Sequence, residues 1–510
     1  MAPTRRQLLS ATGLVTASVC LAACGATPVT APASTITIAA PSAPADLDPY
    51  SCAGAPDLNV LLAAYDTLLR TAPDGTVQAG LATSWQYRSA TRFELRLRTG
   101  VTFTDGTALD AEAVKRNLDR AATSVRTATS NFAGAVRSVE TRGSQEVVIS
   151  LSRPYPDLPA ALAGCTGMIV NPQRLITPEQ LATTTDGSGP YDYDAAHSTP
   201  GSRYVFHRRK DYWNTAAYPF DNAVFTVITD FGAAYDALAA GRVDVAPGVP
   251  AALAQADGAG LGHVQGPADY YMVNLLDRAG ARAPALRDVR VRQALNMAID
   301  RAAISTRFFA GTGRPTAQII APEMPGYDPG LDDAYPYDPG RARQLLARAG
   351  YPDGFTLPVL STDRFQCDAL LQAVADDWAA IGVTVQREVE DYGSYLRTLT
   401  SRELPAAVVP VQGSAPYTAL AGLFEERSRR NPFRSTDPEL GLAFAQARDA
   451  TDAKASDGLR RASALLVEQA WYAGIGHDTV VWFFDPRKVT GLQMRKGDPV
   501  PRFYDWRPVS

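Results

Sequence analysis

The chain has 510 residues, of which 46% are hydrophobic and 20% are charged, and its formal net charge at pH 7 is −4. A chain of this length can bury several hydrophobic cores, and about two to four domains are expected. The slightly negative charge excludes a strong electrostatic attraction to nucleic acid, so the composition favours a soluble globular protein of another class.

Residues 1–23, MAPTRRQLLSATGLVTASVCLAA, have the pattern of an export signal, with two arginines, a weakly apolar stretch broken by Gly13, and small residues at the end. The apolar stretch is too short and too rich in Gly, Ser and Thr for a membrane span, which needs about 20 mostly apolar residues. The letters LAAC resemble a bacterial lipobox, which implies cleavage before Cys24, lipidation of Cys24, and anchoring at the extracytoplasmic face of the cell membrane. An ordinary secretory signal is the alternative. The arginine pair also resembles a twin-arginine signal, so export by the Sec or the twin-arginine route stays open.

Residues 24–33 are rich in Pro, Ala and Thr, which predicts an extended tether. The first ordered element is expected to be a strand at residues 35–40, TITIAA, because its isoleucines alternate along the chain. A helix is predicted over residues 57–70, DLNVLLAAYDTLLR, because its leucines recur at helical spacing.

The next block, RFELRLRTGVTFTDGTALDAEAVKRNLDR, predicts a hairpin followed by a helix. Phe93, Leu95 and Leu97 alternate with charged residues, as in a strand with one buried face. The Asp-Gly pair at 105–106 makes a turn, and Asp110 can cap the helix that follows.

Two later segments carry helix signals. In DPGRARQLLARAG, Asp338 can cap the first turn, Pro339 suits the first helical position, and Gly350 suits the left-handed position after the last turn. In DVRVRQALNMAIDRAAI, Asp288 caps a helix with one apolar face, so its arginines are expected on a solvated face. The apolar positions are Val291, Leu295, Ala298, Ile299 and Ala302.

The cysteines and histidines show no metal-ligand pattern. After Cys24 the chain has Cys52, Cys165 and Cys367, so at most one disulfide can form within it. A Cys52–Cys165 pair and separate buried thiols both remain open. The histidines lie far apart and form no His-Glu-x-x-His pair: His197, His207, His263 and His477. The sequence therefore predicts no metal site and no cofactor.

Two glycine-rich segments resemble catalytic motifs only in part. DGSGP at 186–190 lacks the first glycine of a Gly-x-Ser-x-Gly nucleophile turn, so Ser188 is expected to be a turn residue. GTGRP at 311–315 lacks the Lys-Ser/Thr pair of a phosphate loop. We therefore assign no catalytic residue, and an exported enzyme with a triad built from distant residues remains an alternative.

Several segments follow one another in an order that resembles a known family. They are LATSW, GSGPYDYD, RRKDYWN, ALAAGRVDVAPGV, RDVRVRQALNMAIDRAAI, YDPGRARQLLARAGYPDGFTLPV and LQAVADDWAAIGVTVQREVE. With the hairpin and helix block, this order resembles the extracytoplasmic solute-binding proteins that include the dipeptide-, oligopeptide- and nickel-binding components of ABC importers. The resemblance covers nearly the whole mature chain.

The resemblance implies an α/β, two-lobed periplasmic-binding-protein-like fold of type II, with an extra subdomain inserted in the first lobe. The strands YYMVNLL and VVWFF are expected to cross between the lobes, which supports hinge closure around a ligand. The implied boundaries are lobe I at 34–70, 184–273 and 484–510, the inserted subdomain at 71–183, and lobe II at 274–483.

In oligopeptide-binding relatives the loop after LDP touches the ligand backbone, and here that loop reads LDPYSCAGAPDLN. The resemblance assigns Cys52, Ala53, Gly54 and Ala55 to the cleft. Small side chains would let a ligand approach the main chain closely. The alternative is that these residues only form turns.

Peptide-binding relatives hold the peptide ammonium with an aspartate in a Trp-x-Ala-Asp-Tyr segment of the second lobe, but residues 404–424 here contain no charge. A buried ammonium without a carboxylate costs several kcal/mol. We therefore expect either a ligand without a free α-amine there or another acid, such as Asp363 or Asp391. The alternative is a shifted alignment. The neutral ligand-binding candidates are Gln412, Ser414 and Tyr417.

Aromatic residues of the expected crossings could also line the cleft: Tyr270, Tyr271, Trp482 and Phe484. Side chains alternate along a strand, so Trp482 and Phe484 share one face and Phe483 takes the other. The sequence leaves open which face lines the cleft.

The resemblance implies a monomeric receptor that closes on a peptide-like or other polar small ligand and presents it to ABC permease and ATPase subunits. It implies no nucleic-acid partner. A receptor for a signalling or biosynthetic protein, built on the same fold, is a further alternative.

Overall fold

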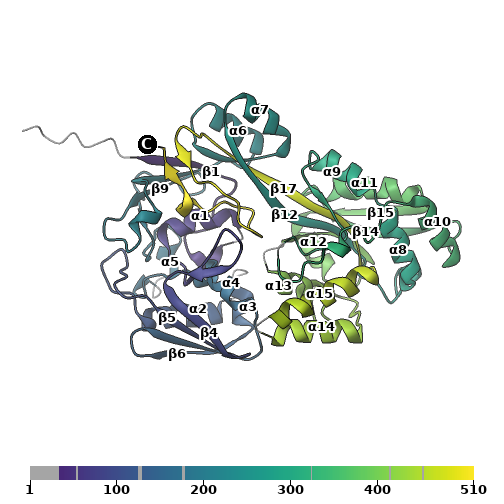
Figure 1. The fold of residues 1–510 in the computed structure, drawn as a ribbon, viewed down its shortest axis with the longest axis horizontal. Coiled ribbons are helices and arrows are strands. Elements are labelled where there is room, and N and C mark those ends of the chain that lie inside the picture. Colours follow the sequence, from purple (N-terminus) through teal and green to yellow (C-terminus); the bar gives the residue numbers. More distant parts are fainter. Residues whose placement is uncertain are drawn as a thin grey trace, which may run out of the picture. The chain divides into compact units, whose positions relative to one another are not determined.

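The computed structural model describes residues 34–52, 55–124, 129–174, 178–322, 324–412, 415–450 and 453–509. These residues belong to one unit, Ser34–Ser510, with a mixed α/β fold (Figure 1). Among them, no helix has the length and apolar character needed to cross a membrane. The expectations for the signal, Cys24 and the tether lie outside the described residues.

One large mixed sheet runs through the unit, with strands from distant parts of the chain. Its first half holds, in spatial order, β11 (Val245–Gly248), β1 (Thr35–Ala40), β10 (Asn222–Val227), β9 (Arg203–Arg208) and β8 (Tyr191–Tyr193). Its second half holds β16 (Ala406–Gln412), β14 (Phe355–Thr362) and β15 (Val383–Glu390). Between the halves lie β12 (Gly262–Asn274) and β17 (Tyr472–Phe484), and the short β13 (Arg314–Pro315) pairs with β17. The strand predicted at TITIAA is confirmed as β1.

The two long strands β12 and β17 pair antiparallel and connect the halves, as expected for the segments YYMVNLL and VVWFF (Figure 1). β17 pairs with β11 in the first half, and β12 pairs with β16 in the second. The register between β12 and β17 is interrupted between Pro267 and Tyr270, and again between Tyr271 and Met272. Such irregularities bend a ladder, so this is the place in the sheet best suited to a hinge.

A separate antiparallel sheet has the order β4 (Ala82–Ser89), β5 (Arg92–Leu97), β7 (Glu146–Leu151) and β6 (Val136–Arg142). Helix α2 (Ala111–Thr123) covers it, and the predicted strand and helix are confirmed. The predicted hairpin is not formed as expected, because β5 pairs with β4 and β7 and the Asp105-Gly106 turn closes only an isolated bridge between Thr102 and Ala108. Phe93, Leu95 and Leu97 are buried in a core that also holds residues of α2. Asp110 Oδ1 accepts a hydrogen bond from the Ala113 amide at 2.8 Å, which caps α2. This sheet falls within the predicted insertion, whose boundaries stay a prediction.

The remaining elements are helices and short strands. The helices are α1 (Ala55–Ala64), α3 (Ser130–Ala133), α4 (Leu158–Leu162), α5 (Pro178–Leu181), α6 (Phe231–Ala239), α7 (Leu253–Gly258), α8 (Val289–Met297), α9 (Arg301–Phe308), α10 (Pro339–Arg348), α11 (Cys367–Ala379), α12 (Tyr392–Leu399), α13 (Pro416–Phe424), α14 (Pro438–Asp449) and α15 (Ala453–Glu468). The short strands are β2 (Leu69–Thr71), which pairs with β3 (Val77–Ala79), and β18 (Val489–Thr490), which pairs with β19 (Arg507–Pro508).

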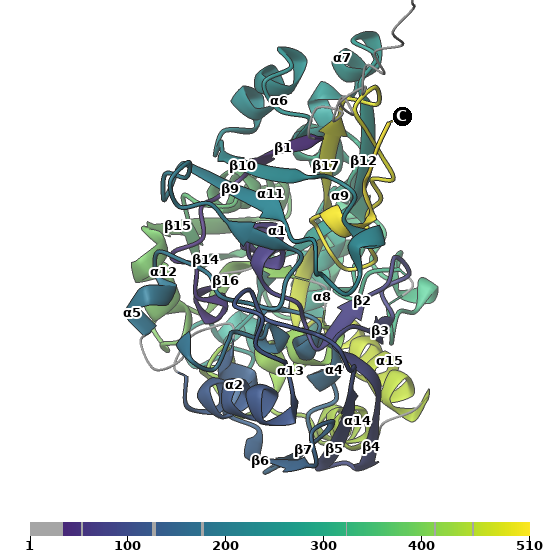
Figure 2. The same cartoon turned by 90° about the vertical axis from the view of Figure 1, so that its left-hand side faces the viewer.

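Helices cover both faces of each half of the large sheet. In the first half, α1 contributes to the core on one face, and α6 and α7 contribute to the core on the other. In the second half, α8 and α11 share a core with one face, and α13, α14 and α15 share a core with the opposite face (Figure 2). Each half is therefore a three-layer α/β arrangement.

The helix predicted over residues 57–70 is too long. It ends at Ala64, and β2 begins at Leu69. The Gly189 amide donates to the Ala64 carbonyl at 2.9 Å, and the Leu68 amide donates to the Gly167 carbonyl at 2.8 Å. In a longer helix the Leu68 amide would donate to the Ala64 carbonyl. Here both groups bond to partners from distant parts of the chain instead.

The arginines near α8 are also placed differently from the prediction. Arg292 and Arg301 are buried, so the expected solvated face is wrong for both. Arg292 donates at 2.8 Å to the carbonyls of Gln469 and Leu286, and Arg301 donates to the Tyr335 carbonyl at 2.9 Å. Carbonyl oxygens thus replace water around each guanidinium.

Helix caps in this region follow the prediction. Asp338 Oδ1 accepts from the Arg341 amide at 2.8 Å, and Gly350 has a φ of +93°. Asp288 caps α8 by accepting from the Arg290 amide at 2.8 Å. The predicted helix is split in two, however, because Asp300 caps α9 as a separate helix.

Candidate functional site

The loop LDPYSC, which the sequence analysis assigns to a ligand cleft, is held by contacts to distant parts of the chain. A disulfide joins Cys52 to Cys165, across a separation of 113 residues, so of the two alternatives the structure has the pair. The Arg120 guanidinium lies 4.6 Å from the centre of the Tyr50 ring and forms an ion pair with Asp48. These contacts tie the loop to α2.

The other residues predicted in this loop are described only in part. Ala53 and Gly54 lie outside the described residues, and Ala55 begins α1. Contact between this loop and a ligand therefore stays a prediction. Cys52 itself is buried, with only 5% of its surface exposed.

The neutral candidates of the second half lie at the end of β16 and in α13. Gln412 is the last residue of β16, and Ser414 lies outside the described residues. Tyr417 lies in the first turn of α13 and is 7% exposed, and its hydroxyl donates to Glu425 Oε1 at 3.1 Å. That hydroxyl already has a protein acceptor, which favours a packing role for Tyr417.

The aromatic residues of the crossing strands lie mostly in cores. Trp482 is 2% exposed and its Nε1 donates to the Pro499 carbonyl at 3.0 Å, whereas Phe484 is only partly buried. Both contribute to the core that contains Cys52, and Phe483 contributes to the core of the opposite face, so the predicted alternation is confirmed. Among these side chains, Phe484 keeps the most surface for a ligand.

The other two aromatic candidates, Tyr270 and Tyr271, are buried in separate cores. Tyr270 donates its hydroxyl to the Thr316 carbonyl at 3.2 Å, and Tyr271 stacks on Phe309 with ring centroids 5.9 Å apart. The structure thus brings Cys52, Trp482 and Phe484 into one core and leaves Tyr417 in another.

Two carboxylates that the sequence analysis missed lie at the irregular part of the crossing strands. Asp269 is the cross-strand neighbour of Gln412, and its amide donates to Asp478 Oδ1 at 2.7 Å. Burial, together with the charge of Asp269, raises the pKa of Asp478 to about 7, and burial also raises the pKa of Asp269. The sequence signal was an aspartate just before each of the two predicted crossing segments, YYMVNLL and VVWFF.

The acids proposed from the sequence are placed less favourably. Asp391 caps α12, where its carboxylate accepts from the amides of Gly393 and Ser394 and from the Ser394 hydroxyl. Asp363 is exposed just after β14. Asp269 is therefore the better-placed acid beside the uncharged segment.

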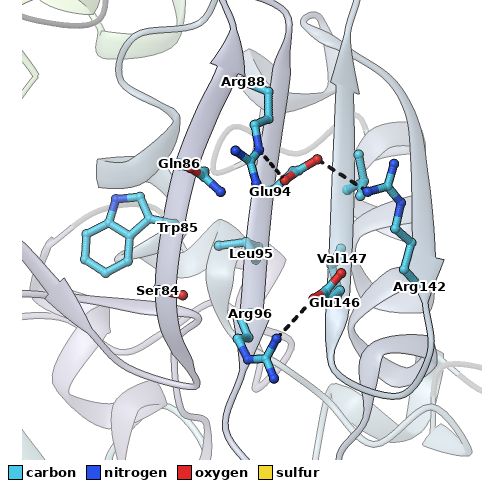
Figure 3. A pocket seen from close by; sticks show the side chains of 11 residues that line it. Ser84, Trp85, Gln86, Arg88, Glu94, Leu95, Arg96, Arg142, Glu146 and Val147 are labelled. Carbon is cyan, nitrogen blue, oxygen red and sulfur yellow. Dashed lines mark hydrogen bonds and ion pairs between the residues drawn. The ribbon is translucent and has the colours of Figure 1, made fainter.

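A hollow of about 400 Å³ lies over the outer face of the four-stranded sheet, and Figure 3 shows its side chains. Glu94 pairs with Arg88 at 2.7 Å and with Arg142 at 3.7 Å, and Arg96 pairs with Glu146 at 3.1 Å. The charges compensate one another, and no predicted site residue lines the hollow. It is best understood as a solvated sheet face. Across the described ranges, no group of three or more His, Cys, Asp or Glu side chains is arranged to hold a metal ion.

Comparison with known proteins identifies relatives along most of the chain. The chain is 28% identical over 359 residues to a glutathione-binding protein, GsiB, of Salmonella paratyphi A, which covers 68% of each chain. It is 29% identical over 247 residues to heme-binding protein A of Haemophilus influenzae, which covers 45% of this chain and 42% of the other. The solved structure of HbpA2 from Haemophilus parasuis superimposes with a TM-score of 0.81 at 22% identity, over 93% of this chain and all of the other.

The fold of the described residues is thus that of periplasmic binding proteins of type II, as the sequence predicts. The model of the family described as bacterial extracellular solute-binding proteins, family 5 (middle), matches residues 76–425. That match spans more than half of the chain. The protein therefore belongs to family 5 of the bacterial extracellular solute-binding proteins.

Proposed function

We propose that this protein captures a peptide-like or other polar small ligand between the two halves of its large sheet and delivers it to the permease of an ABC importer. The family match over residues 76–425 carries this proposal. The two long strands β12 and β17, with their interrupted register, supply a hinge on which the halves can close. The named relatives bind glutathione and heme, which are small molecules with polar groups.

We further propose that the protein works as a receptor and not as an enzyme. Ser188 is fully buried beside the end of α1, which supports its role as a turn residue. Product formation on incubation with cell extract would instead favour the exported enzyme, and a ligand recovered unchanged from purified protein would favour the receptor. Neighbouring permease and ATPase genes would separate import from signalling.

The class of ligand follows from the charges near the end of β16. The segment 404–424 has no charge, whereas Asp269 and Asp478 lie beside the end of β16, in the middle of that segment, without an ion-pair partner among the described residues. We propose a polar ligand without a free α-amine at the uncharged segment. A cationic group of such a ligand would lie on the side of Asp269.

A bound ligand is expected to compact the protein and raise its thermal stability, because closure buries the ligand between the halves. At one hundred times the dissociation constant, binding to the folded state alone adds about 2.7 kcal/mol. Free peptides, their N-acetylated counterparts and neutral oligosaccharides would be titrated by calorimetry, and X-ray scattering and melting curves would be recorded for each binder.

Two results would contradict these proposals. A tight ligand that changed neither the scattering nor the melting temperature would oppose closure. A free peptide that bound at least about tenfold more tightly than its acetylated form, a difference of about 1.4 kcal/mol, would oppose the neutral ligand class. Asp269→Asn and Asp478→Asn would then be the variants to test.

We propose that the mature protein begins at Cys24 and is held at the membrane by a lipid on this residue. Cys24→Ala is expected to abolish incorporation of a fatty-acid analogue and to release the protein from the membrane or leave it uncleaved. Cys20→Ala is the matched control, because Cys20 would leave with the signal. Undiminished labelling of Cys24→Ala would show that the lipoprotein assignment is wrong.

A further inference from the structure

Asp157 makes an unusual long-range contact. Its Oδ2 accepts a hydrogen bond from the Thr418 amide at 2.9 Å and a second one from the Thr418 hydroxyl, across 261 residues of chain. Asp157 directly precedes α4, and Thr418 is the third residue of α13. Both views of the fold show α4 and α13 side by side (Figures 1 and 2).

The contact replaces a missing helix cap. The N-cap residue of α13 is Ala415, which has no side-chain acceptor, so the amides of the first turn need another partner. Asp157 occupies the N-cap position of α4, yet within that described helix it makes no capping bond. Its carboxylate caps α13 instead, where a negative charge also interacts favourably with the helix dipole.

The contact partly withdraws a carboxylate from water. Burial raises the pKa of Asp157 even though the two hydrogen bonds from Thr418 act in the opposite direction. No ion pair to Asp157 is found among the described residues. A half-buried carboxylate with these partners alone loses its hydrogen bonds when Thr418 moves away.

The two partners belong to parts of the fold that the crossing strands separate. α4 follows the last strand of the four-stranded sheet in the sequence, and it packs beside β2. α13 follows β16 and packs in the core of the second half. Bending at the irregular part of β12 and β17 would move these parts relative to each other and break the contact.

We propose that the Asp157–Thr418 contact is a latch that holds the closed arrangement of the protein, with Asp157 as the positioning residue. This inference rests on the closure described under the proposed function. The latch favours the closed arrangement before any ligand binds. For a ligand that binds only the closed arrangement, the apparent affinity rises in proportion to the fraction of protein that is closed.

The test uses purified protein without ligand, so its outcome does not depend on the identity of the ligand. Asp157→Ala is expected to increase the radius of gyration measured by X-ray scattering and to speed hydrogen exchange of the Thr418 amide by about tenfold or more. Asp157→Asn keeps an acceptor oxygen and is expected to restore both values toward those of the unmodified protein. Thr418→Val removes the hydroxyl donor alone and is expected to give an intermediate result.

Asp230→Ala is the matched control, because Asp230 caps α6 by accepting from the Ala233 amide at 2.7 Å within the first half. It is expected to lower the melting temperature without changing the radius of gyration. The latch would be refuted if Asp157→Ala left the scattering and the Thr418 exchange unchanged, or if Asp230→Ala expanded the protein equally. If Asp157→Ala does not fold, expansion of Thr418→Val supports the latch and an unchanged profile overturns it. Absence of ligand binding and of any ligand-induced rise in melting temperature would instead count against the proposed function, whatever the outcome for the latch.

Discussion

Replacing both Cys52 and Cys165 by alanine is expected to lower the free energy of unfolding by about 2–5 kcal/mol. The disulfide joins residues 113 positions apart, so its loss frees a long loop of the unfolded chain and raises the entropy of that state. Urea unfolding followed by circular dichroism would measure the change in midpoint. Both cysteines are buried, so the loop LDPYSC would also lose one of its attachments.

Reductant provides the matched control for this variant. Reducing the unmodified protein is expected to produce a similar loss of stability, whereas reductant is expected to leave the double variant unchanged. Cys367 is a buried free thiol and is present in both proteins. Equal midpoints for the oxidised unmodified protein and the double variant would show that the disulfide does not stabilise the fold.

Asp66→Ala is expected to cost about 3–5 kcal/mol of stability, because it leaves a buried arginine without its counter-ion. Asp66 accepts from Arg70 at 2.9 Å, and from the Tyr212 hydroxyl and the Trp213 indole nitrogen at 2.8 Å each. The Arg70 guanidinium also lies 5.1 Å from the centre of the Tyr504 ring. One carboxylate therefore connects the end of α1 with RRKDYWN and the C-terminal segment.

The measurement is again urea unfolding, with a second Asp-to-Ala variant as the control. Asp457 forms a 3.0 Å ion pair with Arg460 in which both side chains are about half exposed, and such surface pairs contribute about 0–1 kcal/mol. Asp457→Ala is therefore expected to have a small effect. If Asp66→Ala proved as mild as Asp457→Ala, the buried cluster would not stabilise the fold as argued.

Local signals in the sequence predicted much of the secondary structure, because the partners in these interactions are only a few residues apart. Asp110 and Asp338 cap the helices that directly follow them. The alternation in TITIAA gave the correct bounds of β1, since one face of a strand can be read from every second residue. The order of the segments that resemble the family predicted the two crossing strands, also from the sequence alone.

The candidate site was predictable only in part. The sequence analysis proposed Gln412 and the aromatic residues of the crossing strands as ligand-binding candidates. The structure puts Gln412 at the end of β16 and the aromatic residues within β12 and β17. It did not predict that Trp482 and Tyr417 bury their polar groups against protein acceptors. The choice between a buried and an exposed face depends on helices that pack there from elsewhere in the chain.

The sequence by itself determined the class of fold, the local caps and turns, and the family, because each is encoded by neighbouring residues or by their order. Only the tertiary structure decided that α1 ends at Ala64, that Arg292 is buried, and that Asp269 lies beside Gln412. It also decided that Asp157 caps α13 and not α4. The physical reason is common to all four: a polar group withdrawn from water must find a partner, and here each partner comes from a distant part of the chain.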